Sequence, residues 1–264
     1  MNTFSTLELT QNDGIATLTL SRPKTKNAMS FTMMRELVRA ANQLKQNRSI
    51  RAVILRGDGV TFCSGIDLSD LNQASKSWIV WQLLKPGLSL FQAACLAWHK
   101  LPIPVIAAVE GHCLGAGTQL ALAADYVIAT ADSEWSVREA HWGIVPDMGI
   151  SVTALGKIHQ STLLDATYSA RLFSGEHAVS AGFAQELNGT PYIAAQRLAK
   201  EWAQRSPDAL LGSKRVIKGM LGASRLALYR EKWWQIKLLL GKNQRIAVRK
   251  GQGKDATFKP RQYR

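Results

Sequence analysis

The chain has 264 residues, of which 46% are hydrophobic and 20% are charged, a balance typical of globular enzymes and not of disordered or fibrous proteins. It contains no apolar run of the roughly 18 residues that a membrane-spanning helix needs, and its first residues lack the basic start and apolar centre of a signal peptide. The three cysteines have no metal-type spacing, so we expect reduced thiols, a cytoplasmic location and no metal centre: Cys63, Cys95 and Cys113.

The formal net charge of +14 is concentrated at the C-terminal end. Residues 201–264 contain 16 Lys and Arg against 4 Asp and Glu, a net charge of +12, whereas residues 1–200 contain 17 against 15. A basic region of this kind attracts nucleic acid, an acidic partner or a phosphorylated cofactor, and its plainer interpretation is a solvated helical surface. We expect residues 1–200 to form the core with the active site and residues 201–264 to form a basic helical region.

The first half of the chain predicts a strand–helix–strand unit. Apolar and polar residues alternate over 15–20, which indicates a strand, and apolar residues recur at helical spacing over 30–47, with Ser30 as the N-cap. A short buried strand follows at 52–55. Because a connection of this length crosses over, we expect the two strands to pair in parallel.

The same pattern returns after residue 100. It predicts a strand at 105–109, a helix at 116–124 and a strand at 126–129. Turns of small residues follow the strands of both units, at 63–65 and at 114–117. The chain is therefore predicted to have an α/β core.

The segment 70–100 carries many large apolar side chains and is predicted to be helical, with a break at Pro86-Gly87. Such a segment forms core, a subunit interface or the wall of a ligand cavity, and the sequence leaves these open. Beyond residue 190 the chain is again predicted to be helical.

The two turns are candidates for an oxyanion hole. A turn of small residues leaves backbone N–H groups pointing outward, and two converging turns can place two donors on one developing negative charge. The candidate groups are in Gly65-Ile66 and Gly115-Ala116. Taken alone, either turn is explained equally well by close packing.

Two acidic residues further along the chain strengthen this interpretation. Glu139 and Asp147 are eight residues apart, with Gly143 and Pro146 between them, so a turn can place the two carboxylates across a cavity. Apolar neighbours would raise their pKa values and suit them to proton transfer, whereas a solvated loop would leave them ordinary. The residue pattern thus leads as far as an acid–base enzyme with an oxyanion hole.

Short segments spread through the chain have the order and spacing of one enzyme family: 20–24 with 27–28, 62–68, 104–111 with 114–117, 124–126, 143–146, 173–175 and 181–183. Together they resemble the enoyl-CoA hydratase/isomerase (crotonase) family over roughly residues 5–260. The resemblance implies a spiral of β-β-α units with a helical C-terminal region that builds homotrimers, often paired into hexamers. It also implies an acyl-CoA thioester substrate, with coenzyme A as part of that substrate and no separate cofactor.

The resemblance assigns roles to individual residues. It places the two oxyanion N–H donors at Ile66 and Ala116, and a catalytic carboxylate at Glu139. Further positions correspond to contacts with the substrate or its coenzyme A: Lys24, Ala28, Ser64, Gly65, Asp67, Leu68, Gly115 and Gln119. The basic C-terminal region is then a candidate contact for the coenzyme A phosphates, or an oligomer surface.

Two departures from the hydratase pattern bear on the reaction. The first of the two hydratase glutamates falls at Gln119, which cannot take a proton from water, and Asp147 stands where hydratases commonly have glycine. Dienoyl-CoA isomerases of the family have an aspartate at that position. We therefore expect a shift of double bonds from 3,5-dienoyl to 2,4-dienoyl, catalysed by Glu139 and Asp147. The alternatives are 2-enoyl-CoA hydration, 3- to 2-enoyl isomerisation and, from another class, nucleic-acid binding or a catalytically silent scaffold.

Overall fold

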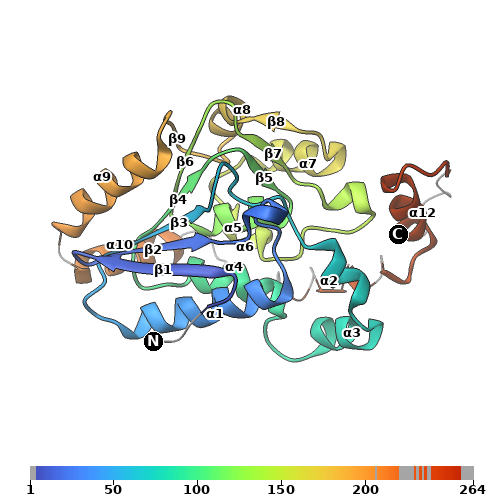
Figure 1. Ribbon diagram of the computed structural model, residues 1–264, viewed down its shortest axis with the longest axis horizontal. Helices are drawn as coiled ribbons and strands as arrows, with labels where there is room; N and C mark the ends of the chain where they lie inside the picture. Colours follow the sequence, from blue (N-terminus) through green and yellow to red (C-terminus); the bar gives the residue numbers. More distant parts are fainter. Residues whose placement is uncertain are drawn as a thin grey trace.

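A parallel sheet forms the centre of the molecule in the computed structural model (Figure 1). Its strand order is β1-β2-β3-β4-β6-β9. The strands are β1 (Leu7–Asn12), β2 (Ile15–Leu20), β3 (Ala52–Gly57), β4 (Val105–Val109), β6 (Tyr126–Ala129) and β9 (Glu186–Leu187). The structure describes residues 4–205, 207–219, 229, 232–233, 235–236 and 239–256.

The predicted parallel pairing is confirmed. β2 and β3 are parallel neighbours, and the chain between them forms helix α1 (Phe31–Gln46). Ser30 is its N-cap, because its hydroxyl accepts a hydrogen bond from the Met33 amide at 3.1 Å. β1, for which no strand was predicted, pairs with β2 in antiparallel register.

Both faces of the sheet are buried at its centre, which explains why β3, β4 and β6 are almost continuously apolar. Along β3, Ile54 faces helix α9 (Pro191–Ala203), and its neighbours Val53 and Leu55 face the opposite side. That opposite side is covered by three helices, namely α1, α4 (Leu90–His99) and α5 (Ala116–Ala123). The predicted helix at 116–124 is therefore confirmed, and it begins directly after the Gly115 turn.

The apolar segment 70–100 folds into short helices that pack on this core. They are α2 (Leu68–Gln73), α3 (Lys76–Leu84) and α4, with the predicted break at Pro86-Gly87 between the last two. Phe31, Trp78 and Phe91 form an aromatic cluster with ring centroids 4.8–6.3 Å apart. Part of this segment is therefore core.

A second, smaller sheet was not predicted, because its strands are too short to show a periodicity. It contains β5 (His112–Leu114), β7 (Glu134–Ser136) and β8 (Phe173–Ser174). The remaining elements surround the two sheets: η1 (Pro23–Thr25), η2 (Glu139–Trp142), α6 (Ile150–Thr153), α7 (Gln160–Ser169) and α8 (Gly175–Ser180).

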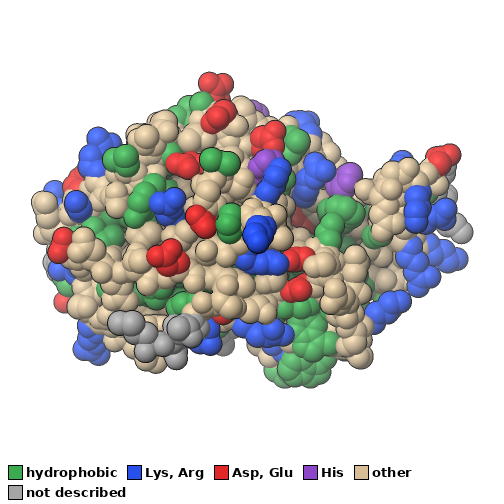
Figure 2. Space-filling view, viewed as in Figure 1, with side chains coloured by type: hydrophobic (Ala, Val, Ile, Leu, Met, Phe, Trp, Pro, Cys, Tyr) green, Lys and Arg blue, Asp and Glu red, His purple; other side chains and the backbone are tan. Residues whose placement is uncertain are grey.

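The described parts of the basic C-terminal region are helical and contact the core. Helix α10 (Pro207–Gly219) is anchored by ion pairs from Lys214 and Lys218 to Asp125. Helix α12 (Lys242–Gly251) lies against η2, and Figure 2 shows basic side chains gathered over it. Across the part of the chain that the structure describes, we find no helix with the length and apolarity needed to cross a membrane.

Candidate active site

The two predicted turns lie side by side. Cys63 and Cys113 are paired in a parallel bridge, with the Cys63 amide donating to His112 O at 2.8 Å and the Leu114 amide donating to Cys63 O at 3.0 Å. Counting forward from this pair, the turns match residue by residue, and both contain a glycine in the left-handed region, Gly65 (φ 110°) and Gly115 (φ 49°). The register therefore places Ile66 and Ala116 at equivalent positions in the two turns.

Close approach of the turns depends on a third glycine. A Cβ atom added at Gly117 would lie 2.5 Å from the carbonyl oxygen of Cys63 and 2.8 Å from its Cβ. These distances are too short for any other side chain unless the backbone moves. Gly117 thus allows the first turn of α5 to rest directly on the Cys63 turn.

The hydrogen bonds that hold the turns use other amides than those of Ile66 and Ala116. Gly65 O accepts from the Met29 amide at 2.8 Å, and the Asp67 amide donates to Met29 O at 3.0 Å, so the Ile66 N–H faces away from Met29. Ala116 is the first residue of α5, where an amide has no acceptor inside its own helix. The role of these two amides as oxyanion donors stays a prediction.

Glu139 lies beside the second turn, in a buried position. A Cβ atom added at Gly115 would be 3.6 Å from Glu139 Oε1, and the residue itself is 8% exposed. Burial raises the pKa of Glu139 to about 7, although a hydrogen bond from Gln119 favours the charged form. Its other oxygen, Oε2, is buried without a hydrogen-bond partner among the described residues. The expected raised pKa is therefore found at this carboxyl group.

Asp147 is also 8% exposed, and it is linked to Glu139 through Gln119. The Gln119 side chain donates from Nε2 to Glu139 Oε1 at 2.6 Å and accepts at Oε1 from the Met148 amide at 3.0 Å. The loop with Asp147 is thus attached to the carboxyl group of Glu139 by a single side chain. Neither acid is in the solvated loop that was the plainer interpretation of this segment.

Helix α12 supports the segment between the two acids. Gly143 ends η2 in the left-handed conformation (φ 71°), and a Cβ atom there would lie 2.8 Å from both Gln244 Cα and Ala247 Cβ. Gly251 makes an equally close approach to the Trp142 ring. Helix α12 is therefore packed against the segment that contains Glu139 and Asp147.

Some of the residues predicted to contact coenzyme A make structural contacts inside the protein, and others are exposed at its surface. Asp67 makes structural contacts: it forms an ion pair with Arg22 at 2.7 Å and caps α2 by accepting a hydrogen bond from the Ser69 amide. Burial acts to raise the pKa of Asp67, but these contacts hold it below its usual range. Ser64 is half-buried and donates from its hydroxyl to Thr25 O at 3.2 Å. Lys24 and Leu68 are exposed, and Ala28 is half-buried.

Sequence reasoning missed Arg22 and the two-sided role of Gln119. Arg22 also donates to the carbonyl oxygen of Ala28 at 2.5 Å, so it joins the loop of Ala28 to the Asp67 turn. Its place in the segment 20–24 was a signal that could have pointed to it. No local pattern could have found Gln119 as a link, because its two partners lie 20 and 29 residues further along the chain.

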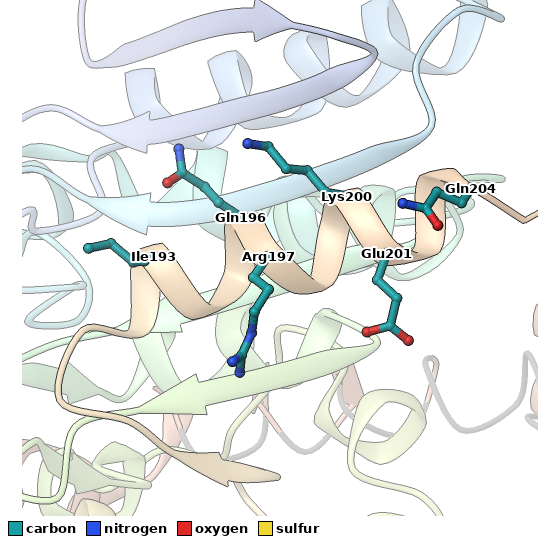
Figure 3. Close-up of a pocket in the computed structure, with 6 residues that line it drawn as sticks. All are labelled: Ile193, Gln196, Arg197, Lys200, Glu201 and Gln204. Atoms are coloured by element: carbon teal, nitrogen blue, oxygen red, sulfur yellow. The ribbon is translucent and has the colours of Figure 1, made fainter.

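A surface hollow of about 480 Å³ lies elsewhere, along α9 (Figure 3). Its side chains project to opposite sides of one helix and do not converge on a point, and none belongs to the predicted site: Ile193, Gln196, Arg197, Lys200, Glu201 and Gln204. A binding site needs convergent polar groups, and this hollow does not provide them.

Known proteins similar to this chain include dienoyl-CoA isomerases and enoyl-CoA hydratases. The chain is 34% identical over 207 residues to the mitochondrial Delta(3,5)-Delta(2,4)-dienoyl-CoA isomerase of Mus musculus, an alignment that covers 74% of this chain and only 63% of that isomerase. It is 29% identical over 230 residues to the peroxisomal dienoyl-CoA isomerase of Arabidopsis thaliana, covering 82% and 83% of the two chains. A probable enoyl-CoA hydratase of Mycobacterium tuberculosis is 31% identical over 231 residues, 86% of each chain.

Solved structures and a family model agree on the fold. An enoyl-CoA hydratase/isomerase from Pseudoalteromonas atlantica matches 97% of this chain and 100% of its own with a TM-score of 0.84 at 24% identity. Carnitinyl-CoA hydratase from Mycobacterium avium gives the same TM-score and identity over 98% and 100%. The family model of enoyl-CoA hydratase/isomerase matches residues 10–232. The chain has the crotonase fold and belongs to the enoyl-CoA hydratase/isomerase family.

Proposed function

We propose that the protein is an acyl-CoA isomerase that moves the double bonds of a 3,5-dienoyl-CoA to the 2,4 positions. The observation that carries this proposal is the pair of buried acids, Glu139 and Asp147, which lie in neighbouring segments held by Gln119: its side chain donates to the Glu139 carboxyl group and accepts from the backbone amide of Met148. Isomerisation of this kind needs one group to remove a proton and a second to return one further along the chain. The two carbons concerned lie roughly 5 Å apart in an extended chain, so two separate carboxyl groups suit them.

The reaction begins at the thioester. Its carbonyl oxygen accepts hydrogen bonds from the Ile66 and Ala116 amides, which stabilise the negative charge that develops there. Asp147 takes the proton from C2, and the electron pair of that C–H bond is delocalised from the carbonyl oxygen to C6. Glu139 then gives a proton to C6, which leaves double bonds at C2 and C4. No atom is gained or lost, and the proton on Asp147 returns to Glu139 through solvent before the next turnover.

The protonation of Glu139 supports this division of roles. With a pKa of about 7, its carboxyl group holds a proton in a large fraction of molecules at neutral pH. A group whose pKa lies near the working pH is well suited to donate a proton in the transition state. The isomerase relatives from mouse and Arabidopsis support the same assignment.

Hydration of a 2-enoyl-CoA is the second candidate. It is favoured by the Mycobacterium tuberculosis relative, whose alignment covers a larger share of both chains than that of the mouse isomerase. In this case Glu139 would activate water alone, because Gln119 cannot accept its proton. A 3- to 2-enoyl shift, with Glu139 as the only shuttle, would likewise use one carboxyl group and leave Asp147 without a role.

The remaining expectations extend the proposal. Lys24, Ser64 and the basic face of α12 would contact the coenzyme A portion of the substrate, and the C-terminal helices would build a trimer or a hexamer. We expect the enzyme to work in the cytoplasm, without a cofactor beyond the coenzyme A of its substrate.

One experiment separates the three reactions. The purified protein is incubated with 2-enoyl-, 3-enoyl- and 3,5-dienoyl-CoA, and products are identified by mass and ultraviolet absorbance. The isomerase produces a 2,4-dienoyl-CoA of unchanged mass, with the absorbance of a diene conjugated to the thioester. A product heavier by one water molecule, formed from 2-enoyl-CoA while the dienoyl substrate is left unchanged, contradicts the proposal.

A further inference from the structure

Gln119 lies in the fully buried helix α5 and is 1% exposed. One end of its side chain contacts Glu139 Oε1 at 2.6 Å, and the other contacts the Met148 amide at 3.0 Å. The neutral amide of Gln119 therefore lies between the carboxyl group of Glu139 and the backbone amide of Met148.

The orientation of this amide is fixed by its partners. A backbone N–H can only donate, so the atom of Gln119 that faces Met148 must be the carbonyl oxygen. The NH₂ group then faces Glu139 and can only donate to it. Glu139 Oε1 is consequently an acceptor in both protonation states, and a proton on this carboxyl group resides on Oε2. Oε2 is the oxygen that is buried without a hydrogen-bond partner among the described residues.

We propose that Gln119 is a positioning residue that holds Glu139 by one oxygen, presents the other oxygen to the substrate, and ties Glu139 to the loop of Asp147. This inference rests on the proposed function for the identity of the substrate. It assigns Gln119 a place inside the protein, whereas the sequence pattern had suggested a contact with the substrate.

Two substitutions distinguish the contributions of the two ends of the Gln119 side chain. Gln119→Met has nearly the same shape and removes both hydrogen bonds. Gln119→Glu keeps an oxygen for the Met148 amide but loses the donor to Glu139 and adds a like charge next to it. Since the lost donor favours the charged form of Glu139, both variants raise its pKa, and Gln119→Glu raises it further.

The first measurement needs no substrate. The carboxyl carbon of Glu139 is titrated by NMR in protein with labelled glutamate, and Glu139→Gln identifies its signal. We expect the titration midpoint to rise by roughly one pH unit in Gln119→Met, because a hydrogen bond to a charged group is worth about 1.5 kcal/mol or more. Amide exchange at Met148 should quicken in Gln119→Met and stay slow in Gln119→Glu.

The second measurement is turnover against pH. If Glu139 donates the proton, kcat falls as pH rises through its pKa, and this fall should move to higher pH in the order wild type, Gln119→Met, Gln119→Glu, with KM nearly unchanged. Gln92→Met is the matched control, because Gln92 is a fully buried glutamine that caps α4. Gln92→Met should lower the free energy of unfolding and leave the titration midpoint of Glu139 unchanged.

The outcomes distinguish this inference from the proposed function. An unchanged Glu139 midpoint in both Gln119 variants, with only a loss of stability, overturns the positioning role and makes Gln119 a packing residue. A shifted midpoint in a protein that does not isomerise 3,5-dienoyl-CoA supports the role of Gln119 and rejects the isomerase. A shifted midpoint together with a shifted pH profile supports both.

Discussion

The half-buried Asp125 and the buried Glu139 have surroundings with opposite effects on the pKa values of their carboxyl groups. Burial acts to raise the pKa of either group. At Asp125, the ammonium groups of Lys214 and Lys218 lie 2.6 and 2.7 Å away and hold the pKa below its usual range. At Glu139, the contact is a neutral amide, and the pKa rises to about 7. The difference arises from the partners and not from burial.

This comparison separates a structural acid from a reactive one. Asp125 also accepts a hydrogen bond from the Val105 amide at 2.9 Å, so it joins the start of β4 to α10. Lys157 lies close enough to interact with it, and burial lowers the pKa of Lys157 and of Lys214 to about 8. An acid that is held ionised by several cations cannot exchange protons at neutral pH, whereas Glu139 can.

The largest effect is expected at the second acid of the site. Asp147→Asn keeps the shape of the side chain and removes the proton acceptor. Turnover of a 3,5-dienoyl-CoA should fall by roughly 10²–10⁴-fold, the usual scale of general acid–base catalysis, and Glu139→Gln should cause a similar loss. Combining the two changes should cost much less than the product of the single effects, because the groups act in one relay. Unchanged isomerisation in Asp147→Asn would contradict the proposed mechanism.

The Asp125 cluster is expected to matter for stability and not for chemistry. Asp125→Asn leaves buried ammonium groups without their anion, and the free energy of unfolding should fall by about 3 kcal/mol in denaturant titrations at pH 7. The matched control is Asp165→Asn, which breaks an exposed ion pair with Arg171. That change should alter stability by less than about 1 kcal/mol. If Asp125→Asn and Asp165→Asn lowered the free energy of unfolding equally, the Asp125 cluster would matter no more for stability than an exposed ion pair.

Glu139 should have the opposite effect on stability. Its pKa in the folded protein is about 7, above the ordinary glutamate value of 4.5, so the folded state gains stability from it at low pH and loses it as pH rises from about 4.5 to 7. Glu139→Gln removes this loss and should raise the free energy of unfolding at pH 8 by roughly 3 kcal/mol, with little change at pH 4. A variant that is less stable than wild type at pH 8 would show that the carboxylate has a partner that offsets its burial.

The basic face of α12 gives the smallest expected effect. Arg245 and Arg249 are exposed on α12, the helix that packs against η2, and changing both to Gln should raise KM for acyl-CoA about two- to fivefold at low salt and leave kcat nearly unchanged. The matched control is the pair Lys45 and Arg48 near the C-terminal end of α1, where the same loss of charge should not alter KM. Binding that does not respond to salt would favour a surface or oligomer role for α12.

The sequence alone determined the local features of this protein. The two-residue alternation at 15–20, the N-cap Ser30, the break at Pro86-Gly87 and the glycines of the two turns act within a few residues of themselves, so their effects can be predicted from the pattern. The segment motifs also identified the family, and they led to the prediction that Glu139 and Asp147 belong to its active site. These inferences needed no knowledge of which distant residues meet.

Contacts between residues that are far apart in the sequence determine which buried acids stay ionised and which can exchange protons. Lys214 reaches Asp125 across 89 residues, and α12 returns to pack on Gly143 after about a hundred. The strands of the second sheet are two or three residues long and show no periodicity. A carboxyl group's pKa depends on which groups surround it within a few ångströms, and the sequence does not state those distances. The pair Glu139 and Asp147 was therefore visible in the sequence, but the amide that links them and the partners that keep Asp125 ionised were not.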